Sequence, residues 1–346
     1  MKSTQHRPKS LIISCHAAGM GSILKGAVAG LLYAELTGRT PLIHWNAHCK
    51  YLRHSAAICD NAFTSFYEST CPNSLSELLK EARTTYPANL QIETLQAQLK
   101  EHQTSFDELE SDDAKLADVL LFPAYVPIQQ VIDCAPHGHP TSKLNEQTAA
   151  EWATKAYIQI CRKTTAQIQQ FWAQHFPEGT PVLTVHIRGG DKYQEAIMPA
   201  LSRYTDAADQ FIKQHPSAKV FLASDSTPAV EYLKKHYKER LVTTPAFRTS
   251  GRKGVHKSGE DGERIGNEIV FDVECLSKGD HFIGYKESNV YFWVCHLTQN
   301  GINKRFTHFS VTSGRKELVL NRHNFKRTVK AKWKGLFSQL KPSDST

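Results

Sequence analysis

The 346-residue sequence exceeds the usual size of a single hydrophobic core, so we expect two domains. Its 40% hydrophobic and 22% charged residues are typical of a globular chain and exclude a disordered one, and no run reaches the roughly 18–20 apolar residues that a membrane-spanning helix needs. The short apolar run LIISC near the N-terminus is interrupted by His16, so we expect no secretory signal and predict a cytoplasmic protein.

Positive charge is concentrated near the end of the sequence. The net charge is +8, and residues 315–341 alone hold nine Lys or Arg against one acidic residue. The remainder carries 33 basic and 33 acidic residues, so we expect no polyanion-binding surface on it and no nucleic-acid partner. Aromatic residues interleave with the cations of 315–341. We expect a helix that packs back on the body. The alternatives are a nucleic-acid contact of this segment or a peripheral membrane contact through an interfacial helix.

The eight cysteines follow no metal-binding spacing, and no CxxC motif occurs. Because no export signal is expected, we predict that most of them are reduced thiols, several of them on buried faces. Disulfide bonds are the alternative.

The first half begins with a β-loop-α-β pattern, for which the expected elements are a strand at Ser10–Cys15, a helix at Ile23–Leu36 and a strand at Pro41–Trp45. Gly38 is a typical stop for the helix. The loop before the helix, HAAGMGS, carries Gly19 and Gly21, and such a loop can bring a phosphate close to a helix N-terminus. Residues 60–150 are more polar and predict mixed helices and loops without a catalytic cluster.

The second half alternates strands and helices. The expected strands are Val182–Ile187, Lys219–Ser224, Leu241–Thr244 and His281–Gly284, and the expected helices are Asp206–Gln214, Pro228–His236, Ile265–Ser277 and Ser288–Leu297. This alternation predicts a mostly parallel, doubly wound sheet, in which ligands bind beyond the carboxyl ends of the strands. We divide the chain into an N-terminal α/β domain (1–177), a C-terminal Rossmann-type domain (178–314) and the basic segment (315–346).

The stretch HIRGGDK follows the first strand of the second half. At the end of that strand, the Arg188 guanidinium can bind a phosphate or carboxylate, and Gly189 and Gly190 let backbone amides approach the same anion. A structural interpretation is also open, in which Arg188 pairs with Asp191 and fixes a tight turn.

Polar residues stand at three further places in this half. Asp225, in VFLASDS, either lines a ligand site or caps the helix that follows. Asp272 lies with Glu274 in an otherwise apolar helix, where a carboxylate is costly unless a partner binds it. Ser288 begins the next helix, where its hydroxyl either binds a phosphate or acts as a plain N-cap.

In this order, the motifs VHIRGGDK, VFLASDS, GNEIVFDVECLSKGDHFIG and KESN resemble those of the α-1,6-fucosyltransferase family (glycosyltransferase family 23), which includes NodZ-like and core fucosyltransferases. The resemblance covers most of 182–295, with a weaker one over GMGSILKGAVAGLLYAELTGRTPLIHW. It implies a GT-B-like pair of Rossmann-type domains facing a cleft, with 1–177 on the acceptor side and 178–314 binding the GDP-sugar. It also implies a metal-independent, inverting transfer of L-fucose from GDP-fucose to an oligosaccharide or glycoconjugate, α-1,6-linked to GlcNAc, without a cofactor.

The resemblance also assigns roles to residues. Arg188 resembles the arginine that binds the donor β-phosphate, and Ser288 resembles the hydroxyl that contacts the same phosphate. Asp272 resembles the carboxylate that accepts from the guanine N1–H and N2 amine, and His186 the histidine beside the base. The further positions that match the donor and catalytic region are Gly19, Gly21, Asp191, Lys192, Glu195, Tyr204 and Asp225.

The chemistry explains why such residues are needed. Breaking the sugar–diphosphate bond leaves negative charge on the β-phosphate, which a metal-free enzyme must stabilise with side chains such as Arg188 and Lys192. The acceptor hydroxyl must lose a proton to a base, for which Glu195 is the first choice and Asp191 the second.

Three features depart from the family pattern. Gly189 stands where eukaryotic members often carry a second arginine, the loop before Glu195 is one residue shorter, and Ser226 follows Asp225 in place of a second carboxylate. A non-catalytic GDP-sugar-binding protein therefore remains an alternative, as does a transferase that uses another GDP-hexose or a protein acceptor.

Overall fold

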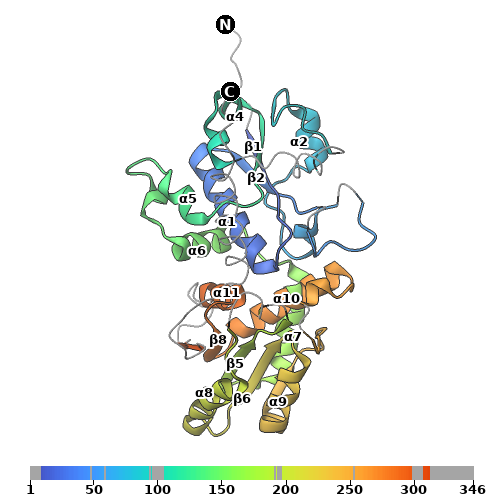
Figure 1. The fold of residues 1–346 in the computed structure, drawn as a ribbon, viewed down its shortest axis with the longest axis vertical. Coiled ribbons are helices and arrows are strands. Elements are labelled where there is room, and N and C mark those ends of the chain that lie inside the picture. The colour runs from blue at the N-terminus through green and yellow to red at the C-terminus, as the bar shows by residue number, and fades with distance from the viewer. Residues whose placement is uncertain are drawn as a thin grey trace, which may run out of the picture.

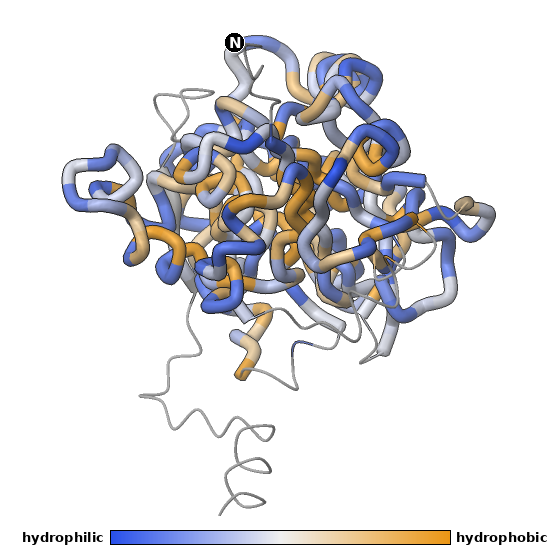
Figure 2. The backbone as a smooth tube through the Cα atoms, turned by 90° about the horizontal axis from the view of Figure 1, so that it is seen from above, coloured by the Kyte–Doolittle hydropathy of each residue, from blue (hydrophilic) through white to orange (hydrophobic). Residues whose placement is uncertain are grey.

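The structure is a computed structural model that describes residues 9–46, 49–57, 60–92, 95, 105–190, 192, 197–251, 254–297 and 307–311. Two α/β units lie one above the other in Figure 1, the N-terminal unit in blue to green and the C-terminal unit in yellow to orange. Viewed from above in Figure 2, hydrophobic residues gather in the middle and hydrophilic residues at the periphery, as in an ordinary globular protein.

The N-terminal unit contains a parallel sheet whose described strands follow the order β2-β1-β4-β3. The strands are β1 (Ser10–Ile13), β2 (Thr40–Ile43), β3 (Thr85–Tyr86) and β4 (Val119–Phe122). The helices are α1 (Met20–Thr37), α2 (Leu75–Glu81), α4 (Asp112–Leu116), α5 (Ile128–Asp133) and α6 (Glu146–Ala156). Strands β1 and β4 are buried along their whole length, which explains why they are continuous apolar runs.

Helix α1 positions one wall of the site described below. It begins at Met20, three residues before the expected start, because Gly19 in an extended conformation serves as its N-cap. It ends where Gly38 adopts a left-handed conformation with φ of 62°. Arg39, which follows, is buried and donates hydrogen bonds to the carbonyls of Ala114 and Ala117, each at 2.9 Å. The arginine of the GRT stretch therefore ties α1 and β2 to the segment before β4.

The C-terminal unit contains a second parallel sheet, with the described strands in the order β7-β6-β5-β8-β9. The strands are β5 (Val182–Ile187), β6 (Lys219–Ser224), β7 (Leu241–Thr243), β8 (His281–Tyr285) and β9 (Thr307–Val311). The helices are α7 (Arg162–His175), α8 (Leu201–Gln214), α9 (Thr227–Tyr237), α10 (Gly262–Ser277) and α11 (Asn289–Leu297). This order is that of a Rossmann-type sheet, so the expected α/β class with mostly parallel strands is confirmed.

Short 3-10 helices occupy several connections: η1 (Ala62–Ser65), η2 (Phe106–Glu110), η3 (Pro140–Lys143), η5 (Lys238–Arg240) and η6 (Val255–Lys257). Helix α7 precedes the domain boundary that the sequence places at 177, yet Ile168 and Phe176 pack with Phe221 in the core of the C-terminal sheet. The three-part division of the chain stays a prediction.

The two units share a packed seam. Trp293 of α11 donates a hydrogen bond from Nε1 to the carbonyl of Gly21, at 3.0 Å. A Cβ atom at Gly21 would lie 2.7 Å from the Cβ of Asn289, so only glycine lets α1 approach α11 this closely. Val270 and Trp293 belong to the same apolar cluster as the core of the N-terminal unit. The units are therefore held together along α1, α10 and α11.

Some expectations fall outside the described residues. The segment 315–346, with its expected helix and its alternative membrane contact, is one of these, and the cytoplasmic location stays a prediction. Within the described part of the chain, no helix has the length and apolarity needed to span a bilayer. The cysteines of that part are free thiols: Cys15, Cys49, Cys71, Cys134, Cys161, Cys275 and Cys295.

Candidate functional site

A cavity of about 460 Å³ lies between the two units, a volume that suits a nucleotide-sized ligand. The N-terminal unit contributes residues 17–22, at the start of α1, together with Lys50 and Tyr51. The C-terminal unit contributes the carboxyl ends of β5 and β6, η6, α10 and the start of α11. The site therefore lies where ligands bind in Rossmann-type sheets.

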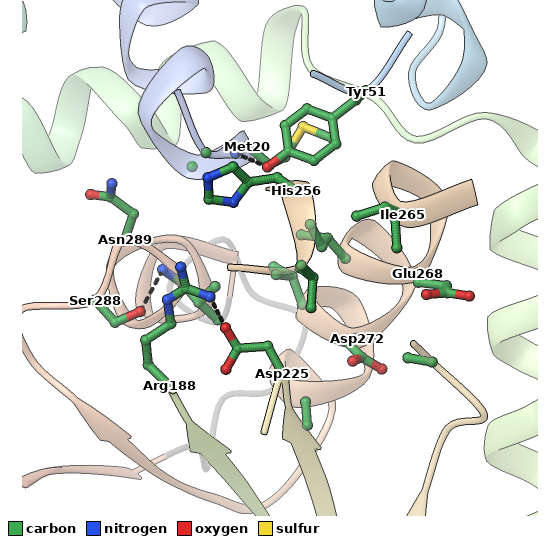
Figure 3. Close-up of a pocket in the computed structure, with 18 of the residues that line it drawn as sticks. Met20, Tyr51, Arg188, Asp225, His256, Ile265, Glu268, Asp272, Ser288 and Asn289 are labelled. Carbon is green, nitrogen blue, oxygen red and sulfur yellow. Dashed lines mark hydrogen bonds and ion pairs between the residues drawn. The ribbon is translucent and has the colours of Figure 1, made fainter. Parts of the chain in front are cut away.

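Arg188 and Asp225 form an ion pair on the floor of the cavity (Figure 3). Strands β5 and β6 pair in register, Ile187 opposite Ser224, so the two residues that follow the strands meet. Asp225 also accepts a hydrogen bond from the backbone N–H of Gly189 at 2.6 Å. The carboxylate thus holds the guanidinium, whose side chain stays 21% exposed, at the cavity surface.

This arrangement decides between the interpretations of Asp225. The residue is not the N-cap of α9, because Ser226 takes that place and accepts from the N–H of Ala229 at 3.4 Å. Asp225 instead positions Arg188. Asp191, the partner of Arg188 in the tight-turn interpretation, lies outside the described residues.

Gly189 is closely packed against the loop after β6. A Cβ atom there would lie 2.8 Å from the Cβ of Ser226 and 3.3 Å from Oδ1 of Asp225. The second arginine that eukaryotic family members often carry at this position would therefore require this loop to move.

Two helix N-termini face the cavity, one from each unit. Ser288 is buried at the start of α11, and its Oγ accepts from the N–H of Val290 at 3.2 Å, so the hydroxyl proton can be donated to an anion. At the start of α1, the N–H of Met20 donates to the Tyr51 hydroxyl at 2.8 Å. Because helix N-termini carry partial positive charge, both ends favour an anionic ligand.

Carboxylates occupy the opposite side of the cavity, on α10 (Figure 3). Asp272 accepts a hydrogen bond from Oγ1 of Thr244 at 2.7 Å, and burial raises the pKa of this carboxyl to about 7. Glu268 accepts from the N–H of Phe247 at 2.8 Å and pairs with Arg264. The cavity is therefore bipolar, with cation and helix ends on one side and hydrogen-bond acceptors on the other.

His186 is the last residue but one of β5 and is buried at the cavity wall. Burial, with a further contribution from Arg188, lowers its pKa to about 3, so the imidazole is neutral. Within the described part of the chain its buried Nδ1 has no hydrogen-bond partner. A buried polar atom of this kind favours a ligand that supplies the missing partner.

The cavity brings together most of the site residues that the sequence predicts: Gly19, Gly21, His186, Arg188, Lys192, Asp225, Asp272 and Ser288. Tyr204 is an exception, because it is fully buried in the core between α8 and β5 and does not line the cavity. Its position gives its predicted donor contact no support. Asp191 and Glu195 lie outside the described residues, so the choice of base between them stays a prediction.

Sequence reasoning missed several cavity-lining residues: Lys50, Tyr51, Phe247, His256 and Lys257. They lie in loops and in η6, where no periodic pattern marks a residue as facing a ligand. Within the described residues, no three His, Cys, Asp or Glu side chains form a group that could hold a metal ion. The predicted lack of a metal site stays a prediction.

Two Rossmann-type units that face a cleft at the carboxyl ends of their strands define a GT-B-like fold, as the resemblance implies. Among solved structures, the fold is similar to that of the fucosyltransferase NodZ from Bradyrhizobium, with 18% identity, a TM-score of 0.53 and coverage of 83% of this chain and 93% of that one. POFUT1 in complex with GDP matches at 12% identity and a TM-score of 0.53, covering 88% of this chain and 99% of that one.

A variant of Arabidopsis thaliana FUT1 in complex with GDP also matches, at 10% identity and a TM-score of 0.52, covering 90% of this chain and 73% of that one. No protein-family model and no curated protein matches the sequence. The resemblance to fucosyltransferases that the motifs indicate is thus confirmed in the fold.

Proposed function

We propose that the protein transfers L-fucose from GDP-fucose to a hydroxyl group of an oligosaccharide or glycoconjugate. This proposal depends mainly on the bipolar cavity. Arg188, Lys192 and the start of α11 at Ser288 line it together, and Asp272 lies on the other side. A guanosine diphosphate has the same polarity, with an anionic diphosphate at one end and N–H donors at the other. NodZ α-1,6-fucosyltransferase has been solved with GDP and with GDP-fucose, which supports the same donor here.

In the proposed complex, Asp272 accepts from the guanine N1–H and N2 amine, two adjacent donors that suit one carboxylate. Buried His186 lies beside the base, and Arg188, held by Asp225, binds the β-phosphate together with Ser288. As the sugar–phosphate bond breaks, these groups stabilise the charge that develops on the leaving diphosphate. Transfer is metal-independent and inverting in this proposal, with an α-1,6 linkage to GlcNAc as its finer form.

The first experiment is a thermal-shift panel with GDP, GDP-fucose, GDP-mannose and UDP-GlcNAc, each with and without EDTA. We expect the guanosine ligands to raise the melting temperature in proportion to the logarithm of ligand concentration over Kd, and EDTA to change nothing. The donor assignment would be refuted if UDP-GlcNAc alone stabilised the protein. It would also be refuted if EDTA abolished the stabilisation by the guanosine ligands.

The second experiment measures GDP release from GDP-fucose with a β-1,4-linked GlcNAc tetrasaccharide as acceptor, and determines the linkage and anomeric configuration of the product by NMR. Binding of GDP-fucose without release of GDP would favour a non-catalytic GDP-sugar-binding protein. Faster release from GDP-mannose would favour a different GDP-hexose, and transfer to a protein in place of the sugar would redefine the acceptor.

A further inference from the structure

His16 lies in the loop between β1 and α1, and contacts fix it on three sides. Its Nδ1 lies 3.1 Å from the carbonyl oxygen of Ala124, and its Nε2 lies 3.1 Å from Oγ of Ser22. The ring of Tyr125 meets it edge-on, with centroids 5.0 Å apart and an angle of 71° between the planes. The imidazole is therefore oriented by the loop after β4 and by the first turn of α1.

These contacts determine the tautomer. A carbonyl oxygen can only accept, so Nδ1 carries the hydrogen and Nε2 presents its lone pair. The Ser22 hydroxyl then donates to Nε2. Burial lowers the pKa of His16, the positive charge of Lys50 lowers it further, and the Ala124 carbonyl opposes both by raising it. At neutral pH the side chain is thus an uncharged imidazole with a basic nitrogen aimed at a hydroxyl.

Ser22 is also a residue of the cavity. Ser22 lines the wall formed by the N-terminal unit, whereas Arg188 and Ser288 line the wall formed by the C-terminal unit. In an inverting transfer the acceptor attacks opposite the leaving group. With the diphosphate against Arg188 and Ser288, an acceptor that reaches the sugar along the wall formed by the N-terminal unit would pass Ser22.

We propose that Ser22 and His16 form a relay that takes the proton from the acceptor hydroxyl. This proposal rests on the proposed function. The acceptor oxygen forms a bond to the anomeric carbon, and the bond from that carbon to the β-phosphate oxygen breaks, leaving its electron pair on GDP. The acceptor proton passes to Oγ of Ser22 while the Ser22 proton passes to Nε2 of His16. The resulting imidazolium keeps its Nδ1–H bond to Ala124, and solvent removes the proton afterwards.

The relay differs from the prediction based on resemblance, which gives the base role to Glu195 of the C-terminal half. The two assignments can be separated by substitution. His16→Asn keeps an amide N–H for the Ala124 carbonyl but has no proton acceptor at the Nε2 position. His16→Gln offers Ser22 an amide acceptor but cannot take up a proton. His236→Asn, on an exposed histidine of α9, is the matched control.

The experiment measures the Kd for GDP by calorimetry, and kcat for GDP release from GDP-fucose with the GlcNAc tetrasaccharide between pH 5 and 9. For the wild-type protein we expect kcat to be constant above pH 7 and to fall with unit slope below the ordinary pKa of histidine. We expect both His16 variants to keep the wild-type Kd, to lose about 100–10,000-fold in kcat and to lose the acidic limb. Ser22→Ala should lower kcat at least about tenfold at unchanged Kd.

Several results would overturn the relay. Wild-type kcat in His16→Asn, with activity abolished in Glu195→Gln, would return the base role to the carboxylate. Wild-type kcat in His16→Gln would mean that His16 only positions the loop. Should His16→Asn fail to fold, full activity in Ser22→Ala would refute the relay equally well. A wild-type protein that neither binds GDP nor releases it from GDP-fucose would refute the proposed function, and the relay with it.

Discussion

The pKa of Asp272 makes a specific prediction about nucleotide binding. Burial raises this pKa to about 7, so at pH 7 about half of the molecules without ligand carry a neutral carboxylic acid there. The guanine N1–H and N2 amine need the ionised carboxylate. Binding must therefore expel a proton at low pH, and affinity should rise with pH until the carboxyl is fully ionised.

The magnitude follows from the titration. The ionised fraction falls about tenfold between pH 8 and pH 6, so the affinity for GDP should fall about tenfold, or about 1.4 kcal/mol. Asp272→Asn should abolish this slope. It should also weaken GDP binding at pH 8 by about 1–3 kcal/mol, because an amide N–H would face a guanine N–H without a partner.

The assay is calorimetry with GDP and UDP in parallel from pH 5 to 8.5. UDP carries the same diphosphate, so the titration of the terminal phosphate affects both nucleotides and cancels in the ratio of their affinities. Glu268→Gln is the matched control, because Glu268 lies on the same helix but holds the backbone of Phe247. It should keep the slope and move its midpoint to lower pH, because the charge of Glu268 contributes to the raised pKa of Asp272. The guanine contact would be refuted if the ratio of the GDP and UDP affinities of the wild-type protein did not depend on pH. An unchanged slope in Asp272→Asn would refute it as well.

Two further predictions concern the loop after β5. Arg188→Ala should lower kcat for GDP release from GDP-fucose by about 100–1,000-fold, because it removes one fixed donor from the leaving phosphate. The circular dichroism spectrum should stay that of the wild type. Turnover close to that of the wild type would exclude the phosphate contact. Gly189→Ala should lower the free energy of unfolding in denaturant by about 1–3 kcal/mol, because the added Cβ would lie 2.8 Å from the Cβ of Ser226. An unchanged midpoint would show that the two loops are not closely packed.

The C-terminal sheet could be predicted from the sequence because its strands are short apolar runs that end in polar residues. Arg188 and Asp225 directly follow two neighbouring parallel strands, and this alone places them at the same edge of the sheet. Their direct ion pair was not predicted, because a short polar stretch such as SDS looks the same whether the aspartate caps a helix or contacts a neighbouring strand end.

Tyr204 lies on the buried face of an amphipathic helix. Helix α8 buries Tyr204 and Ala208 and packs Phe211 and Ile212 against the same core, a spacing of one helical face. That periodicity marks Tyr204 as a core residue. The predicted helix begins at 206, five residues after the observed start, so the prediction leaves Tyr204 outside the helical pattern.

The N-terminal wall of the cavity could be predicted only in part. The glycines of the first loop stand out in the sequence, but Gly21 is explained by its close approach to Asn289, a contact between units that are distant in the sequence. Lys50 and Tyr51 lie in a loop whose position depends on the packing of the whole unit. No local pattern therefore marks them as cavity residues.

Gly189 leaves no room for a second arginine, yet positive charge still lines the cavity from several segments. Lys192 and Lys257 come from the C-terminal unit, and Lys50 comes from the N-terminal unit. The start of α1 adds a helix N-terminus from the same side as Lys50. A diphosphate bound at Arg188 would therefore be in the field of groups from both units. Trp293 and Gly21 join the two units beside the cavity. The packing between the units therefore also sets how closely the lysines and the start of α1 approach the leaving group.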